Sequence, residues 1–175
     1  EVADPTQAQD AATKADVDAV KSGLDVKDSV KVASAAALAA STYANGTNGV
    51  GATLTANANG ALTIDGVAMS TNDRVLIKDQ TDAAQNGVYV VTNAGGASAT
   101  FVLTRATDTD SAAEMTGGTF VFAEQGTANA DNGFVFTHNG SPTMGTTDLT
   151  VSQFSGAGQI TAGAALTKTG NTLNV

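Results

Sequence analysis

The stretch NDRVLIKDQT at residues 72–81, followed by QNGVYVV at residues 85–91, decides the fold class of this chain. In both parts, apolar residues recur at every second position among β-branched and aromatic neighbours. A period of two is typical of a strand that buries one of its faces. The polar residues between the two parts, ending in Asn86–Gly87, favour a turn. The sequence therefore predicts two strands, 74–78 and 87–92, joined by a hairpin loop.

The same alternation recurs through the middle of the chain, in short runs separated by turn signals about 8 to 14 residues apart. Further predicted strands are 62–65, 101–106, 119–124, 133–138 and 149–154, with a half-buried strand around 26–32 before them. Regular short strands of this kind indicate an all-β meander. We expect a small antiparallel β-sandwich or a partly open β-barrel, with most of the Phe side chains in its core.

Two loop regions are candidates for ligand contact. Residues 41–60 are expected to form a loop or an irregular hairpin, because they hold three Asn–Gly pairs and few large apolar groups. Loops of this length are often functional. The loop after residue 78 is also dense in polar groups. The candidate contact residues are Tyr43, Asn45, Asn48, Asp79, Gln80 and Asp82.

Composition excludes several classes of function. The 175 residues carry 8 basic and 17 acidic side chains, a formal net charge of −9, and no cysteine. Thiol chemistry, disulfides and cysteine-based zinc sites are therefore excluded. The dispersed basic residues do not form the stripe that nucleic acid binding requires. No run approaches the roughly 20 apolar residues that span a bilayer, so neither a nucleic acid partner nor membrane insertion is expected.

The first 23 residues are predicted to form a helix. Asp4 is placed to cap its start, Pro5 suits the first helical position, and Gly23 suits the end. The apolar residues Val17, Val20 and Leu24 follow a coiled-coil spacing but cover barely one heptad. So short a helix needs a partner in water. It either packs against its own β domain or self-associates through this seam into a short parallel bundle.

The chain divides into three parts on this reasoning. Residues 1–23 form the helical segment, 24–155 the all-β module, and 156–175 a Gly-rich connector. Glycines break the apolar residues of the last part into brief groups that cannot bury much surface. We expect that part to be an extended β-like segment stabilised by another chain or by further sequence.

The polar residues considered for chemistry give no strong site. Asp108 and Asp110 are spaced to offer oxygens to Ca²⁺, but the full acidic calcium loop is absent, so they are weak candidates and no metal or cofactor is expected. Glu114 and Glu124, with Asp108 or Asp131, are nominal glycosidase carboxylates, and acids are common in this chain. His138 is expected to be a surface residue beside a turn. We expect no enzymatic activity.

Several long motifs resemble one known family. DPTQAQDAATKADVD at residues 4–18 resembles the DPxxAQDAATKxYVD segment of bacteriophage tail fibre proteins, although Ala15–Asp16 stands where the family usually has a Tyr. The module that often follows is similar to LDVKDSVKVA at 24–33, to the stretch 64–81 with its NDRVLIKDQT, and to QNGVYVV. The terminal ITAG and LTKTGNTL, within 160–173, are similar to the connecting repeats of such fibres.

This resemblance implies a virion structural protein located in the tail fibre, usually a homotrimer, with helical necks and β modules along its length. The implied partners are other fibre or baseplate proteins and a host surface polysaccharide or outer membrane protein. There is no Trp and there are only two Tyr for sugar stacking, which favours a shaft or connector role. The alternatives are a receptor-binding module of the fibre and, less favoured, a polysaccharide depolymerase.

Overall fold

The computed structural model describes residues 25–155, 167–169 and 172–174. This part of the chain is mainly β, as predicted. It contains no α-helix, and one short 3-10 helix, η1 (Ala83–Gln85), begins where the Asp82 carboxylate accepts a hydrogen bond from the backbone N–H of Ala84. The predicted N-terminal helix, its Val17–Val20–Leu24 seam and most of the 156–175 connector lie outside the described residues.

Ten strands form one mixed sheet, and four more form two separate hairpins. The strands are β1 (Asp25–Val26), β2 (Val30–Ala33), β3 (Ser41–Ala44), β4 (Thr53–Ala56), β5 (Thr63–Ile64), β6 (Val67–Ala68), β7 (Arg74–Ile77), β8 (Gly87–Gly96), β9 (Ala99–Arg105), β10 (Thr119–Gln125), β11 (Asn132–Phe136), β12 (Val151–Ser155), β13 (Thr167–Thr169) and β14 (Thr172–Asn174). The β5–β6 and β13–β14 pairs are the hairpins.

The large sheet follows the order β12-β11-β10-β2-β7-β8-β9-β4-β3, with β1 paired to β10. The expectation of an antiparallel sheet throughout is wrong at two places: β1 runs parallel to β10, and β2 lies between β7 and β10 and runs parallel to both. Its sequence explains this position, because Val30, Val32 and Ala33 are fully buried. Strands covered on both faces are typical of parallel pairing. The predicted strand around 26–32 is thus split into β1 and β2.

The hairpin predicted from the opening motif is confirmed. β7 and β8 pair antiparallel, with Val75 opposite Tyr89 and Leu76 opposite Val88. Alternate residues of these strands enter two different hydrophobic clusters: Leu76 and Val88 one, Val75 and Tyr89 the other. The two strands are therefore buried on both faces, at the centre of the module.

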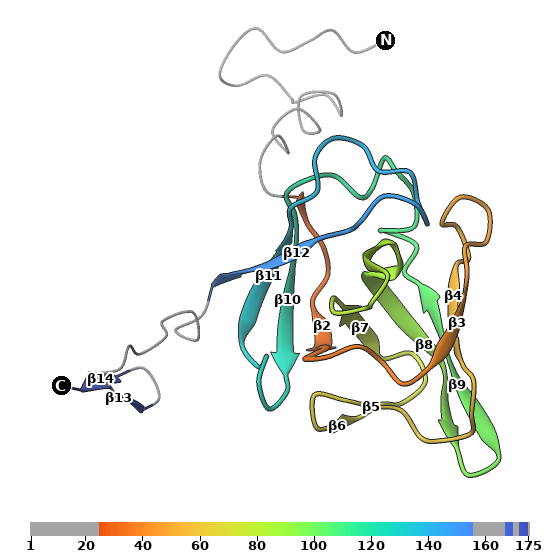
Figure 1. The fold of residues 1–175 in the computed structure, drawn as a ribbon, viewed down its shortest axis with the longest axis horizontal. Helices are drawn as coiled ribbons and strands as arrows, with labels where there is room; N and C mark the ends of the chain where they lie inside the picture. The colour runs from red at the N-terminus through yellow and green to blue at the C-terminus, as the bar shows by residue number, and fades with distance from the viewer. Residues whose placement is uncertain (1–24, 156–166, 170–171, 175) are drawn as a thin grey trace, which may run out of the picture.

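The two clusters are completed from opposite ends of the sheet. β10 and β11 supply Val121, Ala123, Phe134 and Phe136 to the first cluster. β4 and β9 supply Leu54, Ala56, Phe101 and Leu103 to the second, which the β5–β6 hairpin also joins through Ile64 and Val67. Figure 1 shows these ends well apart, with β10, β11 and β12 on one side and β3, β4 and β9 on the other.

The other predicted strands are also present, with shifted ends. Residues 41–60 form the hairpin β3–β4, within which the Thr47–Val50 bridge closes an irregular tip. The prediction that most Phe side chains lie in the core holds for only three of the six. Phe122 and Phe154 are exposed, because the strands of the β10–β12 end bury only one face.

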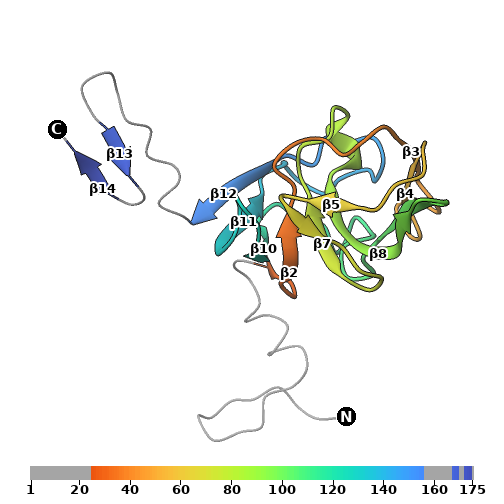
Figure 2. The same cartoon turned by 90° about the horizontal axis from the view of Figure 1, so that it is seen from below.

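We call β1, β10, β11 and β12 the end sheet. β1 runs parallel to β10, β10 antiparallel to β11, and β11 antiparallel to β12, so β1 and β12 point the same way. The sheet therefore begins at Asp25 and ends at Ser155 with the chain direction unchanged. Figure 2 shows β10, β11 and β12 side by side at this end of the module.

The described stretches of the chain hold no helix that is long and apolar enough to span a membrane.

Candidate functional site

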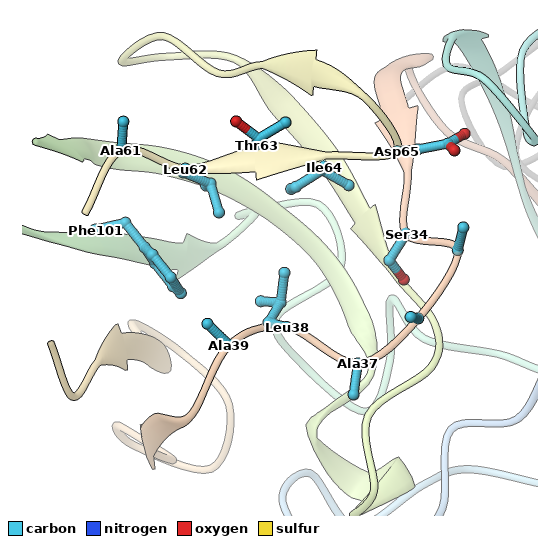
Figure 3. A pocket seen from close by; sticks show the side chains of 12 residues that line it. Ser34, Ala37, Leu38, Ala39, Ala61, Leu62, Thr63, Ile64, Asp65 and Phe101 are labelled. Carbon is cyan, nitrogen blue, oxygen red and sulfur yellow. The ribbon is translucent and has the colours of Figure 1, made fainter. Parts of the chain in front are cut away.

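A hollow lies beside the Ala-rich segment that links β2 to β3. One cavity of about 250 Å³ opens between residues 34–39 and residues 61–65, and Phe101 also lines it. Figure 3 shows Leu38, Leu62 and Phe101 turned toward the space between the two segments, while Thr63 turns away. The alternation along β5 explains this, because Leu62 is buried and Thr63 exposed. Most side chains that line the cavity are therefore apolar, while polar atoms also form a large part of its surface.

A second hollow, of about 290 Å³, lies between residues 37–41 and the loop that joins β7 to β8. Gln80, Asp82 and Gln85 line it, so the structure brings two of the predicted contact residues to one cavity. The Nε2 atom of Gln80 is buried and has no hydrogen-bond partner in the described part of the chain. A hydroxyl or carbonyl oxygen of a bound molecule would accept the hydrogen bond that this buried amide group leaves unmade.

The other polar groups around these hollows make contacts within the protein. The Asp79 carboxylate accepts hydrogen bonds from Ser34 Oγ at 3.2 Å and Lys78 Nζ at 3.0 Å. The Asp65 carboxylate accepts from the backbone N–H groups of Ala128 and Asn129, at 3.0 and 2.8 Å. Asp79 and Asp65 therefore fix the loops that form the rim.

The predicted contact residues of the β3–β4 hairpin do not gather into one ligand site. Tyr43 is half-buried, and its hydroxyl donates to Asn45 Oδ1 at 2.8 Å. Asn45 in turn donates from Nδ2 to the backbone oxygen of Met144 at 2.9 Å. Asn48 is exposed at the tip of the hairpin, with a φ of 51° that suits a turn residue. Tyr43 and Asn45 thus tie the hairpin to the loop before β12.

Sequence reasoning missed a buried polar centre at Arg105. This side chain is only 2% exposed, and its Nη1 donates to the backbone oxygen of Asn86 at 3.0 Å. Its Nη2 donates to the hydroxyl oxygens of Tyr89 at 3.0 Å and Tyr43 at 3.4 Å. The signal was in the sequence: Arg105 continues the inward positions of Phe101 and Leu103 with a period of two.

The Tyr89 ring completes this centre. The guanidinium carbon of Arg105 lies 4.9 Å from the ring centroid, within the range of a cation–π contact. Burial raises the pKa of the Tyr89 hydroxyl well above its usual range, against the opposing effect of the Arg105 charge. The hydroxyl therefore keeps its proton and donates it to the backbone oxygen of Gln85 at 2.6 Å.

The weak metal candidates have separate roles. The Asp108 carboxylate accepts from Arg74 Nη2 at 2.7 Å in an ion pair. Asp110 is 7% exposed, and burial raises its carboxyl pKa, with the neighbouring Glu114 raising it further. Glu114 also accepts a hydrogen bond from Ser111 Oγ at 2.8 Å. Among the residues described, no group of three or more acidic, His or Cys side chains is arranged to hold a metal ion.

The expectation that His138 is a surface residue is wrong. It is 7% exposed, and its Nε2 lies 3.1 Å from the backbone oxygen of Met115. Its ring also meets Phe136 edge to face, with centroids 6.4 Å apart. The alternation of β11 continues beyond the strand to this residue and turns its side chain inward. Two of the nominal glycosidase carboxylates lie elsewhere. Glu124 accepts a hydrogen bond from Ser29 Oγ, and Asp131 is exposed with a φ of 57°.

Comparison with protein-family models, with curated proteins and with solved structures gives no match to this chain.

Proposed function

We propose that this chain is a structural segment of a bacteriophage tail fibre and serves as a shaft or connector module in attachment of the virion to its host. The motifs at residues 4–18, 72–81 and 166–173 support the family. Residues 1–23 form a helical neck that joins three copies through Val17, Val20 and Leu24. The β module follows as a curved, partly open barrel-like sheet, and the C-terminal residues continue as a β connector.

One observation carries the connector role. The sheet begins on β1 and ends on β12, and these strands point the same way with only β10 and β11 between them in the pairing order. A chain that enters at Asp25 and leaves at Ser155 therefore keeps its direction through the module. Modules strung in line along a fibre need this property, whereas a domain whose ends meet at one point would branch from the axis.

The mass of the full chain in solution tests the assembly. Light scattering after size exclusion should give about three times 17.3 kDa. A single-chain mass at all concentrations would overturn the trimer. Antibodies raised against the purified chain should also label the tail fibres of the virions that carry it in negative-stain micrographs. Labelling of the capsid alone, or of no virion, would overturn the fibre assignment.

A receptor-binding role is the second candidate, and the hollow at Gln80 favours it. There a buried amide donor and the exposed Asp82 carboxylate stand beside the small residues 37–41. Polar groups that converge on a small cavity suit sugar hydroxyls. Binding of the full chain to whole host cells should then fall at least tenfold in Gln80→Ala and stay unchanged in Gln125→Ala, an exposed position on β10. Equal binding by both variants, or none by the wild type, would exclude this role.

A further inference from the structure

An exposed apolar face covers the outer side of the end sheet. We define this aromatic face by five residues of its four strands, Val26, Phe120, Phe122, Val135 and Phe154. The register places them on one side, since Val26 pairs with Phe120 and Phe120 with Val135. The Phe120 and Phe154 rings meet edge to face, with centroids 5.8 Å apart and planes at 85°. The face is therefore continuous from β1 across to β12.

The exposure of this face is unusual within the described module. Val26 is 65% exposed, Phe154 64% and Phe122 38%, and the other large apolar residue exposed there is Val50, in the β3–β4 hairpin. Single exposed apolar residues need no explanation, but several in one patch mark an interaction site. The side chains on the opposite side of β10, Val121 and Ala123, are fully buried in the core. The aromatic face is thus a second apolar surface that the module itself does not cover.

We propose that the aromatic face packs against other copies of this chain, so that the β modules, and not only the N-terminal segments, form the contacts of the assembly. This inference rests on the proposed homotrimer and says which surface of the module faces its axis. Val26 follows Leu24, the last residue of the proposed Val17–Val20–Leu24 seam, by two residues in the sequence, so a seam formed there would lead into β1. A parallel bundle of the preceding segments would bring three such faces together at its end.

The segments of the same chain that flank the module are less suited to cover the aromatic face. Residues 1–24 hold no aromatic residue, and their larger apolar side chains are Val2, Val17, Val20 and Leu24. Residues 156–175 also lack aromatic residues. Complete burial of an aromatic side chain removes on the order of 150–250 Å² from solvent, and aromatic pairs gain further from edge-to-face contact. A partner would cover the part of this area that Phe122 and Phe154 still expose. The same face on another copy supplies matching rings, which neither segment does.

Charge reversal on the face tests the proposal in the full chain. In Phe122→Glu/Phe154→Glu, the dissociation constant of the assembly should rise at least a hundredfold or the chain should become monomeric, because repelling carboxylates replace the facing rings. The matched control is Val50→Glu, at a residue 51% exposed and outside the aromatic face, which should assemble as the wild type does. Sedimentation equilibrium measures the mass, and thermal unfolding shows that each variant is folded.

The outcomes separate this inference from the proposed function. A double variant that assembles as tightly as the wild type overturns the inference and leaves the fibre trimer intact. A wild type that is monomeric overturns the inference and the trimer together, while antibody labelling of virions still decides the fibre assignment.

If the double variant does not fold, a second measurement tests the inference. The chain has no cysteine, so Phe122→Cys places one reactive thiol on the aromatic face and Val50→Cys places the control thiol elsewhere. In the assembled protein, alkylation at position 122 should be at least tenfold slower than at position 50. Equal rates overturn the inference. Slow alkylation in a sample whose measured mass is that of one chain also overturns it, because the chain would then cover its own face.

Discussion

The guanidinium group of Arg105 lies directly over Gly87, so closely that a Cβ atom at residue 87 would stand 2.1 Å from Nη1 of Arg105. Gly87 also has a φ of 153°, which side chains rarely adopt. The glycine of the QNGVYVV motif is therefore required by an arginine that lies 18 residues later in the sequence. This contact joins the first residue of β8 to the inner face of β9.

Substitution of Gly87 tests this contact. Gly87→Ala should lower the free energy of unfolding by about 2 kcal/mol or more, because it adds backbone strain and a clash with a buried side chain. Urea unfolding measures the change. Gly96→Ala is the matched control, since an added Cβ there meets no atom within 4 Å, and it should change stability by less than about 0.5 kcal/mol. Equal losses in the two variants would contradict the role given to Arg105.

Truncation of Arg105 should be more costly. Arg105→Ala removes a 2%-exposed side chain and leaves the oxygens of Asn86 and Tyr89 without this donor, for an expected loss of about 3 kcal/mol. In the double variant with Gly87→Ala, the loss of unfolding free energy should be smaller than the sum of the two single losses by at least about 0.5 kcal/mol. The reason is that the added Cβ at residue 87 no longer clashes with the Arg105 guanidinium. Strict additivity would show that the two residues do not interact.

The Asp65 carboxylate should hold the loop after β10 in place. Its oxygens accept the N–H groups of Ala128 and Asn129, and Asn129 in turn donates from Nδ2 to the backbone oxygen of Ser34 at 2.9 Å. Asp65→Ala should cost about 1–2 kcal/mol and speed amide hydrogen exchange at residues 128 and 129. The exposed Asp148→Ala serves as control. Unchanged exchange at both amides in the Asp65 variant would refute this contact.

Asp110 should make stability depend on pH in an unusual direction. Burial, and then Glu114, raise its folded-state pKa above the ordinary 3.8. A raised pKa means that the folded state holds the proton more tightly, so this contribution to stability is present below pH 3.8 and is lost as the pH rises through the folded pKa. At pH 7, Asp110→Asn should therefore be more stable than the wild type, and the difference should shrink toward pH 3. A constant difference across this range in urea unfolding would contradict the assignment.

Asp73 should act in the opposite direction. Burial opposes ionisation, but the hydrogen bond from Lys31 Nζ at 2.7 Å and that from the Ser70 N–H hold the pKa of its carboxyl below 3.8. A depressed pKa gives stability that is present above pH 3.8 and is lost as the pH falls through the folded pKa. Asp73→Asn should therefore be less stable than the wild type at pH 7, and its stability should fall less than that of the wild type as the pH is lowered. An identical acid profile for the two proteins would exclude this contribution.

Local patterns predicted the strands well, because each depends on alternation within a few residues. The hairpin of β7 and β8 follows directly from residues 72–91. The position of β2 between β7 and β10 was not predictable, since pairing partners far apart in sequence leave no local mark. The expectation of an exposed His138 was wrong because two local patterns meet at this residue. The turn residues that follow it favour exposure, whereas the alternation of the strand before it turns the side chain inward.

The candidate site was predicted only in part. Asp79, Gln80 and Asp82 lie between β7 and β8, as predicted, and their contact with a ligand stays a prediction. Composition does not tell a residue that fixes a loop from one that is left for a ligand. Arg105 was overlooked although its position in the alternation of β9 points inward. A charged residue at an inward position is a stronger indication of a built polar centre than a cluster of acids in a turn.

The common direction of β1 and β12 also determines how the module would bear mechanical load. Tension applied between Asp25 and Ser155 acts along the strands of the end sheet, whereas the hydrogen bonds of its antiparallel ladders lie across them. These ladders are thus loaded in shear, so several bonds must fail together instead of opening one after another. The β3–β4 hairpin and β9 are not part of the end sheet and do not carry this tension. Their loops can therefore change in sequence without lowering the force that the end sheet withstands.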